Sequence, residues 1–216
     1  MNFKMHTYGE SEADTVLIQM VDDHDMEVIE SEVSHIRELT AGQAFCLRAL
    51  KVNDWNKDLS PWKAPAVFGS ENFGDGAGAT LSYIIKEIVP TADFPGKVFI
   101  GGYSLAGLFA LWAGYQTDRF DGVAAASPSV WFPGFTEYMR GRSICTNAVY
   151  LSLGDREERT RNPVMAKVGE AIREAHSILE NDGTDCVLEW NKGNHFKESD
   201  VRTAKAFAWL MNQSKD

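Results

Sequence analysis

The chain has 216 residues, enough for one well-packed core and short for two, so we expect residues 1–216 to form a single compact domain. Hydrophobic residues make up 44% and charged residues 24%, an ordinary balance for a globular protein that excludes disordered and collagen-like classes. The formal net charge is −10, and a surface of that sign repels phosphates, so nucleic acid is not expected as a partner.

The termini and the cysteines bear on location. No apolar run approaches the roughly 20 residues of a membrane span, and residues 1–10 lack the basic and then apolar profile of a signal peptide. We therefore expect a cytoplasmic protein with no membrane partner. Cys46, Cys145 and Cys186 lie in or beside apolar runs and form no C-x-x-C motif, which predicts buried, reduced thiols.

The first predicted strand covers residues 15–21, a nearly continuous apolar run typical of a strand buried on both faces. The acidic stretch 22–25 follows it as a solvated loop. Its carboxylates and His24 are metal-ligand types, but ion ligands usually come from separated positions, so no metal is expected. Apolar residues at helical spacing then predict a helix over 28–39, stopped by Gly42, and a second strand over 44–52.

Two loops and a helix come next. Residues 53–62 are mostly polar but include Trp55 and Trp62, which either anchor the loop to the core or line a pocket. Residues 69–78 contain four glycines without a P-loop pattern, so we expect a flexible connection rather than a phosphate site. A helix then continues to Pro90.

The stretch 97–112 is the centre of the sequence. The β-rich run Val98-Phe99-Ile100 leads into Gly102-Tyr103-Ser104-Leu105-Ala106-Gly107 and then into apolar residues at helical spacing. This is the context of a nucleophile elbow, in which a strained turn lifts a serine clear of the sheet and needs very small residues two places before and after it. Gly102 and Ala106 occupy those places, with alanine where glycine is usual.

Strands and helices continue to alternate after this stretch. We predict strands over 120–126, 148–153 and 186–190, a long helix from Pro163 to Ile178, and a last helix over 201–210. This order predicts an α/β fold: a mostly parallel central sheet with helices on both faces. Since ligands bind beyond the carboxyl ends of such strands, one sheet edge should gather Asp22, Trp55, Ser104, Trp131, Glu157 and His195.

A serine hydroxyl needs a base to become a nucleophile, and the base needs a third group to orient it. His195 is the best candidate base, because it alone among five histidines lies in a short loop with a nearby glycine after the last strand, and His24 is its only rival. The orienting acid should lie between Ser104 and His195, which leaves Asp155, Glu157 and Glu158 open.

An acyl-transfer site also needs two donors for the oxyanion of its tetrahedral intermediate. The backbone N–H of Leu105, just after the serine, is one candidate. The other should come from the loop after an earlier strand, where Asp22 or Asp23 is in position.

The elbow sequence Tyr103–Leu111, the turn Ser127-Pro128-Ser129-Val130-Trp131 and the loop Gly193-Asn194-His195-Phe196 together resemble the putative-esterase family of α/β-hydrolases. This family includes S-formylglutathione hydrolases and enterochelin-type siderophore esterases. The resemblance implies an α/β-hydrolase fold and a Ser-acid-His esterase whose acid, three residues after a strand-ending glycine, is Glu157. Siderophore esterases place an arginine after the second strand; this chain does not, which disfavours a siderophore substrate.

The sequence therefore predicts a serine esterase that cleaves a small carboxylic ester or thioester through an acyl-serine intermediate, without a cofactor or metal. Trp55, Trp62 and Trp131 would shape the substrate pocket. About twenty residues separate Ser127 from the next strand, too few for a lid domain, so the site should be open. The alternatives are an acyltransferase with the same triad and a non-catalytic ligand-binding protein of this fold.

Overall fold

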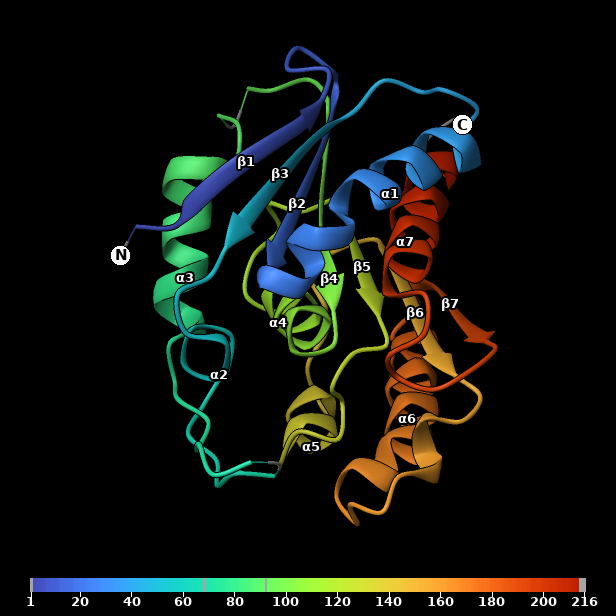
Figure 1. The fold of residues 1–216 in the computed structure, drawn as a ribbon. Coiled ribbons are helices and arrows are strands. Elements are labelled where there is room, and N and C mark those ends of the chain that lie inside the picture. Colours follow the sequence, from blue (N-terminus) through green and yellow to red (C-terminus); the bar gives the residue numbers. More distant parts are fainter. Residues whose placement is uncertain (1, 68, 92, 214–216) are drawn as a thin grey trace.

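A single seven-stranded sheet organises the computed structural model, which describes residues 2–67, 69–91 and 93–213 (Figure 1). The strands lie in the order β1-β3-β2-β4-β5-β6-β7. Within this sheet, β1 (Lys4–Gly9) pairs antiparallel with β3 (Cys46–Lys51). β3 runs parallel to its other neighbour, β2 (Thr15–Val21), and so do β4 (Lys97–Tyr103), β5 (Gly122–Ala126), β6 (Ala148–Gly154) and β7 (Asp185–Asn191) to theirs.

Helices cover both faces of the sheet, as predicted. α1 (Asp23–Leu39) and α7 (Ser199–Gln213) pack on one face, and α3 (Ala77–Tyr83), α4 (Leu105–Gly114) and α6 (Val168–Asn181) pack on the other. Successive residues of β2 join different clusters: Leu17 packs on the α1 and α7 side, and Ile18 on the α4 side. This burial on both faces explains why the strand reads as a continuous apolar run.

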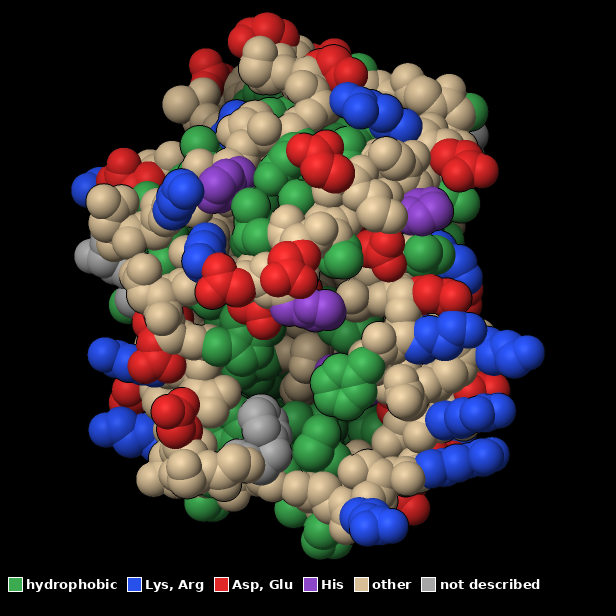
Figure 2. All heavy atoms as spheres, viewed as in Figure 1, with side chains coloured by type: hydrophobic (Ala, Val, Ile, Leu, Met, Phe, Trp, Pro, Cys, Tyr) green, Lys and Arg blue, Asp and Glu red, His purple; other side chains and the backbone are tan. Residues whose placement is uncertain are grey.

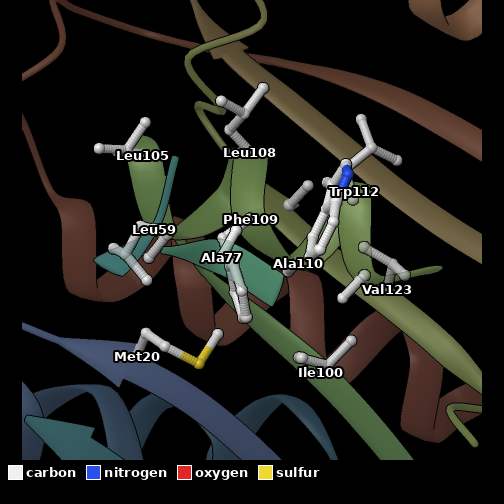
Figure 3. Packing of buried hydrophobic residues seen from close by; sticks show 14 of the residues in the cluster. Met20, Leu59, Ala77, Ile100, Leu105, Leu108, Phe109, Ala110, Trp112 and Val123 are labelled. Atoms are coloured by element: carbon white, nitrogen blue, oxygen red, sulfur yellow. The ribbon is translucent and has the colours of Figure 1, made fainter. Parts of the chain in front are cut away.

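α4 is the most buried helix, since all of its residues from Leu105 to Gly114 are buried. In Figure 3 its Phe109 side chain points towards residues of the sheet, including Met20 and Ile100. A helix that is apolar all round is stable only inside a core. It therefore gives the residue at its N-terminus a rigid support.

Five shorter elements connect this framework: α2 (Trp55–Asp58), a π-helical turn (Ile84–Ile88) that continues α3, α5 (Phe135–Met139), and the 3₁₀ turns Glu157–Arg159 and Met165–Lys167. In the part of the chain that the structure describes, no helix is both long and apolar enough to cross a bilayer.

Two local predictions were wrong, and one strand was not predicted. The stretch 22–25 is not a loop, because Asp22 caps α1 and the helix begins at Asp23. The helix predicted from Pro163 begins as α6 only at Val168; before it, the Asn162 side chain accepts the N–H groups of Val164 and Met165 and holds a tighter turn. β1 was not anticipated, because its alternating exposed and half-buried residues give no apolar run.

The glycine-rich stretch is held by backbone contacts rather than being a flexible connection. The N–H groups of Gly74 and Gly76 donate to Asn56 and Lys57 carbonyls at 3.1 and 2.8 Å. A Cβ on Gly76 would lie 2.6 Å from the Lys57 carbonyl oxygen, so this close approach requires glycine.

The cysteine prediction holds in part. All three thiols are free, but only Cys46 is buried; Cys186 is half-buried and Cys145 is exposed. Cys145 lies in a surface segment before β6, and its backbone N–H donates to the Gly114 carbonyl. An adjacent apolar residue was therefore a poor guide to burial there.

Candidate active site

Ser104 lies at the tight turn between β4 and α4, with φ 58° and ψ −120°. Such a positive φ is unusual for a residue with a side chain and is characteristic of strained functional turns. A Cβ on Gly102 would lie 2.6 Å from the Ala106 Cβ, and one on Gly107 would lie 2.9 Å from the Gly102 oxygen. Gly102 thus makes the room that Ala106 uses, which explains why alanine is accepted at that position.

The three residues predicted for the triad are joined by hydrogen bonds. Nε2 of His195 lies 3.0 Å from Oγ of Ser104, and Nδ1 lies 2.7 Å from Oε2 of Glu157. They come from the ends of β4, β6 and β7, which the parallel sheet brings to one edge. The imidazole is therefore within reach of both the hydroxyl proton and a carboxylate.

The contacts of the three candidate acids distinguish them. Glu157 reaches the imidazole, and its side chain is only 4% exposed. Asp155 accepts the Gly193 N–H at 2.8 Å, and Glu158 faces Arg173 on the surface at 3.5 Å. Of the three, Glu157 alone has the geometry of an orienting acid, as the family resemblance implied.

The second carboxylate oxygen of Glu157 is also fully engaged. Oε1 accepts the Gly154 N–H at 2.7 Å, the Ser127 hydroxyl at 2.8 Å and the Arg202 guanidinium at 2.9 Å. Three donors, one of them charged, satisfy this oxygen and hold the side chain in place. Oε2 is then free to face the imidazole as an acceptor.

Arg202 of α7 was not anticipated, and its guanidinium connects most of the site. Its side chain is 1% exposed, and Nη1 donates to Glu157, the Ser127 hydroxyl and the Tyr103 hydroxyl. Nη2 donates to the Asn194 carbonyl at 3.0 Å, in the loop that carries the imidazole. A buried charge is tolerated because the opposite charge and several acceptors surround it.

Tyr103 supports the same loop from the other side. Its hydroxyl donates to the His195 carbonyl at 2.8 Å, and the ring centroids of the two residues lie 5.2 Å apart. Burial, with the nearby Glu157 charge, raises the pKa of Tyr103 to about 12, so its hydroxyl keeps its proton at neutral pH.

The Ser127–Trp131 turn closes the site next to the nucleophile. The Ser129 N–H donates to the Ser104 carbonyl at 3.0 Å, and the hydroxyl groups of the two serines lie 3.3 Å apart. Ser127 has φ 42°, a strained conformation that turns its hydroxyl towards Glu157. The turn therefore contacts both ends of the hydrogen-bonded chain.

The two predicted oxyanion donors differ in availability. Leu105 is the first residue of α4, so its N–H has no acceptor within the helix. The Asp22 N–H donates to Oδ2 of Asp25 at 3.1 Å, and Oδ1 of Asp22 accepts the Asp25 N–H at 2.8 Å in a reciprocal capping box. Burial, together with the Asp22 charge, raises the pKa of Asp25 to about 7.

A cavity of about 540 Å³ opens beside the serine. Trp55 and Trp131 line it, as predicted, along with Asp22, Tyr103, Met165 and Phe196. Figure 2 shows the lower part of this face hollowed, with hydrophobic side chains along its walls. The described residues include no cluster of three or more His, Cys, Asp or Glu side chains able to hold a metal ion.

Trp62 is not among the described residues that line the cavity. It packs with Phe132, Phe135 and Tyr138, and its indole N–H donates to the Pro133 carbonyl at 2.9 Å. Of the two uses that a loop tryptophan offers, it serves as an anchor.

No protein-family model and no curated protein sequence matches the chain. Solved structures do resemble it. An IroE-like serine hydrolase from Shewanella oneidensis superposes with a TM-score of 0.78 at 15% identity, over 97% of this chain and 76% of that one. The siderophore hydrolase EstA from Aspergillus nidulans superposes with a TM-score of 0.68 at 20% identity, and the match covers 98% of this chain and 90% of that one.

The enterobactin esterase FES from Shigella flexneri superposes with a TM-score of 0.63 at 16% identity, and the match covers 98% of this chain and 56% of that one. At such identities the likeness concerns the fold. Taken with the mostly parallel sheet and its turn at Ser104, these similarities show that the chain has the α/β-hydrolase fold.

Proposed function

We propose that this protein is a serine esterase that hydrolyses a carboxylic ester or thioester through an acyl-serine intermediate. One observation carries the proposal: the unbroken hydrogen-bonded chain from Ser104 through His195 to the buried Glu157, at the mouth of an apolar cavity. That the similar structures are described as hydrolases and esterases supports the same reaction.

In the proposed mechanism, the Ser104 hydroxyl attacks the ester carbonyl while Nε2 of His195 takes its proton. The imidazolium then donates that proton to the leaving alcohol, and a water molecule repeats the sequence to release the acid. Glu157 holds Nδ1 protonated, so that Nε2 is the basic nitrogen.

The negative oxygen of the tetrahedral intermediate needs donors, each worth about 3 kcal/mol. The Leu105 N–H is the first, since the helix leaves it unpaired. The Asp22 N–H is the proposed second, and it must turn from the Asp25 carboxylate to the oxyanion as the intermediate forms. A protonated Asp25, favoured by its raised pKa, would compete less for this N–H.

The proposal is tested with p-nitrophenyl esters of increasing acyl length. We expect hydrolysis by the native protein and a loss of about 10³-fold or more in kcat for Ser104→Ala and His195→Ala. Ester cleavage that persists in both variants would refute it. Adding acceptor alcohols separates the two enzyme classes, because an acyltransferase would form new esters faster than free acid.

A further inference from the structure

A second cavity, of about 240 Å³, lies beside the triad. It shares Trp131, Thr160, Met165, His195 and Phe196 with the larger cavity, so the two form one continuous crevice at the imidazole. Phe196 is 86% exposed, so it is not a core residue, and its ring forms part of the wall of both cavities. Atoms of a substrate on either side of the scissile bond can extend into this second space.

The second cavity is lined by Arg156 and Arg159, which differ from most arginines of the chain. Arg173, for comparison, pairs with Glu158 and lies over the Trp190 ring. Among the described residues, neither Arg156 nor Arg159 has a side-chain hydrogen bond, an ion pair or an aromatic ring partner. Two guanidinium groups are therefore available to a ligand at the edge of the active site.

No acid on the cavity wall neutralises these charges. Glu157 is the one carboxylate among the described lining residues, and Arg202 and His195 already occupy its two oxygens. The wall is locally positive although the whole chain carries −10. Figure 2 shows Lys and Arg side chains gathered on the lower right, the side on which Figure 1 places α6.

Backbone contacts fix the segment that carries both arginines. The Arg156 N–H donates to Gly193 in the loop of the catalytic imidazole, and the Arg159 N–H donates to the Arg156 carbonyl, each at 3.1 Å. The two side chains thus start from defined positions next to His195. A site with defined positions and free donors selects a ligand better than scattered surface charges do.

We propose that this crevice, lined by Arg156 and Arg159, binds a carboxylate on the ester substrate, so that the enzyme prefers esters carrying a free carboxylate over neutral esters of the same length. This inference rests on the proposed esterase function. The planar guanidinium fork matches a carboxylate with two parallel hydrogen bonds, which an exposed ammonium group does not provide.

Two pairs of substrates test the proposal. One pair carries the carboxylate on the acyl side (p-nitrophenyl hydrogen adipate against p-nitrophenyl hexanoate), and the other on the alcohol side (4-carboxyphenyl butyrate against phenyl butyrate). We expect the native enzyme to prefer the anionic member of at least one pair on the order of tenfold in kcat/KM after correction for intrinsic hydrolysis rates. The preference should shrink as salt is added.

The double variant Arg156→Gln/Arg159→Gln should lose this preference while its activity on the neutral esters stays the same. Arg161→Gln is the matched control, because Arg161 lies in the same segment, also has no side-chain partner among the described residues and is not among the described lining residues. An equal loss on neutral and anionic esters in the double variant, or no preference in the native enzyme for either pair, would overturn the proposal.

Binding separates this failure from failure of the proposed function. Ser104→Ala protein is titrated with the same carboxylate esters in a calorimeter, with and without the two arginine substitutions. If the esters bind more weakly once the two arginines are replaced, the crevice binds the carboxylate, even if the native protein turns over no ester. Binding that does not depend on the arginines overturns the proposal, whatever the outcome of the turnover assays.

Discussion

Replacing Arg202 with methionine should strongly destabilise the fold, because it leaves a buried carboxylate without its counter-charge. The side chains of Arg202 and Glu157 are 1% and 4% exposed, and four acceptors receive the guanidinium. Removing one partner of a buried ion pair costs about 3–5 kcal/mol. For a chain of this size, that corresponds to a fall in Tm of roughly 6–20 °C.

The assay is chemical denaturation followed by tryptophan fluorescence, with Arg173→Met as the matched control. Arg173 also faces a glutamate, but both side chains are exposed, so its loss should cost at most about 1 kcal/mol. The double variant Arg202→Met/Glu157→Gln should recover part of the stability, because the uncompensated charge is gone. A cost for Arg202→Met no larger than that of the control would refute this reasoning.

Three further predictions concern the elbow, the tryptophans and the capping box. Gly102→Ala should lower the free energy of unfolding by about 1–3 kcal/mol by urea denaturation, and adding Ala106→Gly should recover part of it, because the clash is between the two methyl groups. Trp131→Ala should raise KM with little change in Tm, whereas Trp62→Ala should lower Tm and leave kcat/KM unchanged; the reverse pattern would contradict the assignments. Asp25 has a raised pKa in the fold, so its contribution to stability is full below about pH 4 and is lost as pH rises to about 7. The free energy of unfolding of Asp25→Asn should therefore rise relative to that of the native protein between pH 4 and 8, by up to about 4 kcal/mol. A difference in this free energy that stays constant across the range would count against a raised pKa of Asp25.

The sequence was most informative where local pattern and tertiary structure agree. β2 and β4 are buried on both faces and read as apolar runs, and the glycines around Ser104 are required by a close approach that is local in the chain. Because parallel strands end at one edge, their order was enough to bring His195 near Ser104. The choice of Glu157 needed the family resemblance, since three acids follow β6.

The residues that sequence analysis missed depend on distant contacts. Arg202 looks like any charged residue on an amphipathic helix, and only its neighbours at the end of β4 and in the segments that follow β5 and β6 show that it is buried. Trp62 and Trp131 have similar surroundings in the sequence but different uses in the fold. β1 lies at the sheet edge, where half-exposed residues carry no apolar pattern.

Labelling with a fluorophosphonate, followed by peptide mass analysis, shows whether Ser104 is a nucleophile activated by His195. We expect covalent addition at Ser104, no labelling of Ser104→Ala, and much slower labelling of His195→Ala, because the probe reports a hydroxyl activated by its base. An unlabelled Ser104 in folded protein, or labelling at the same rate without His195, would contradict it.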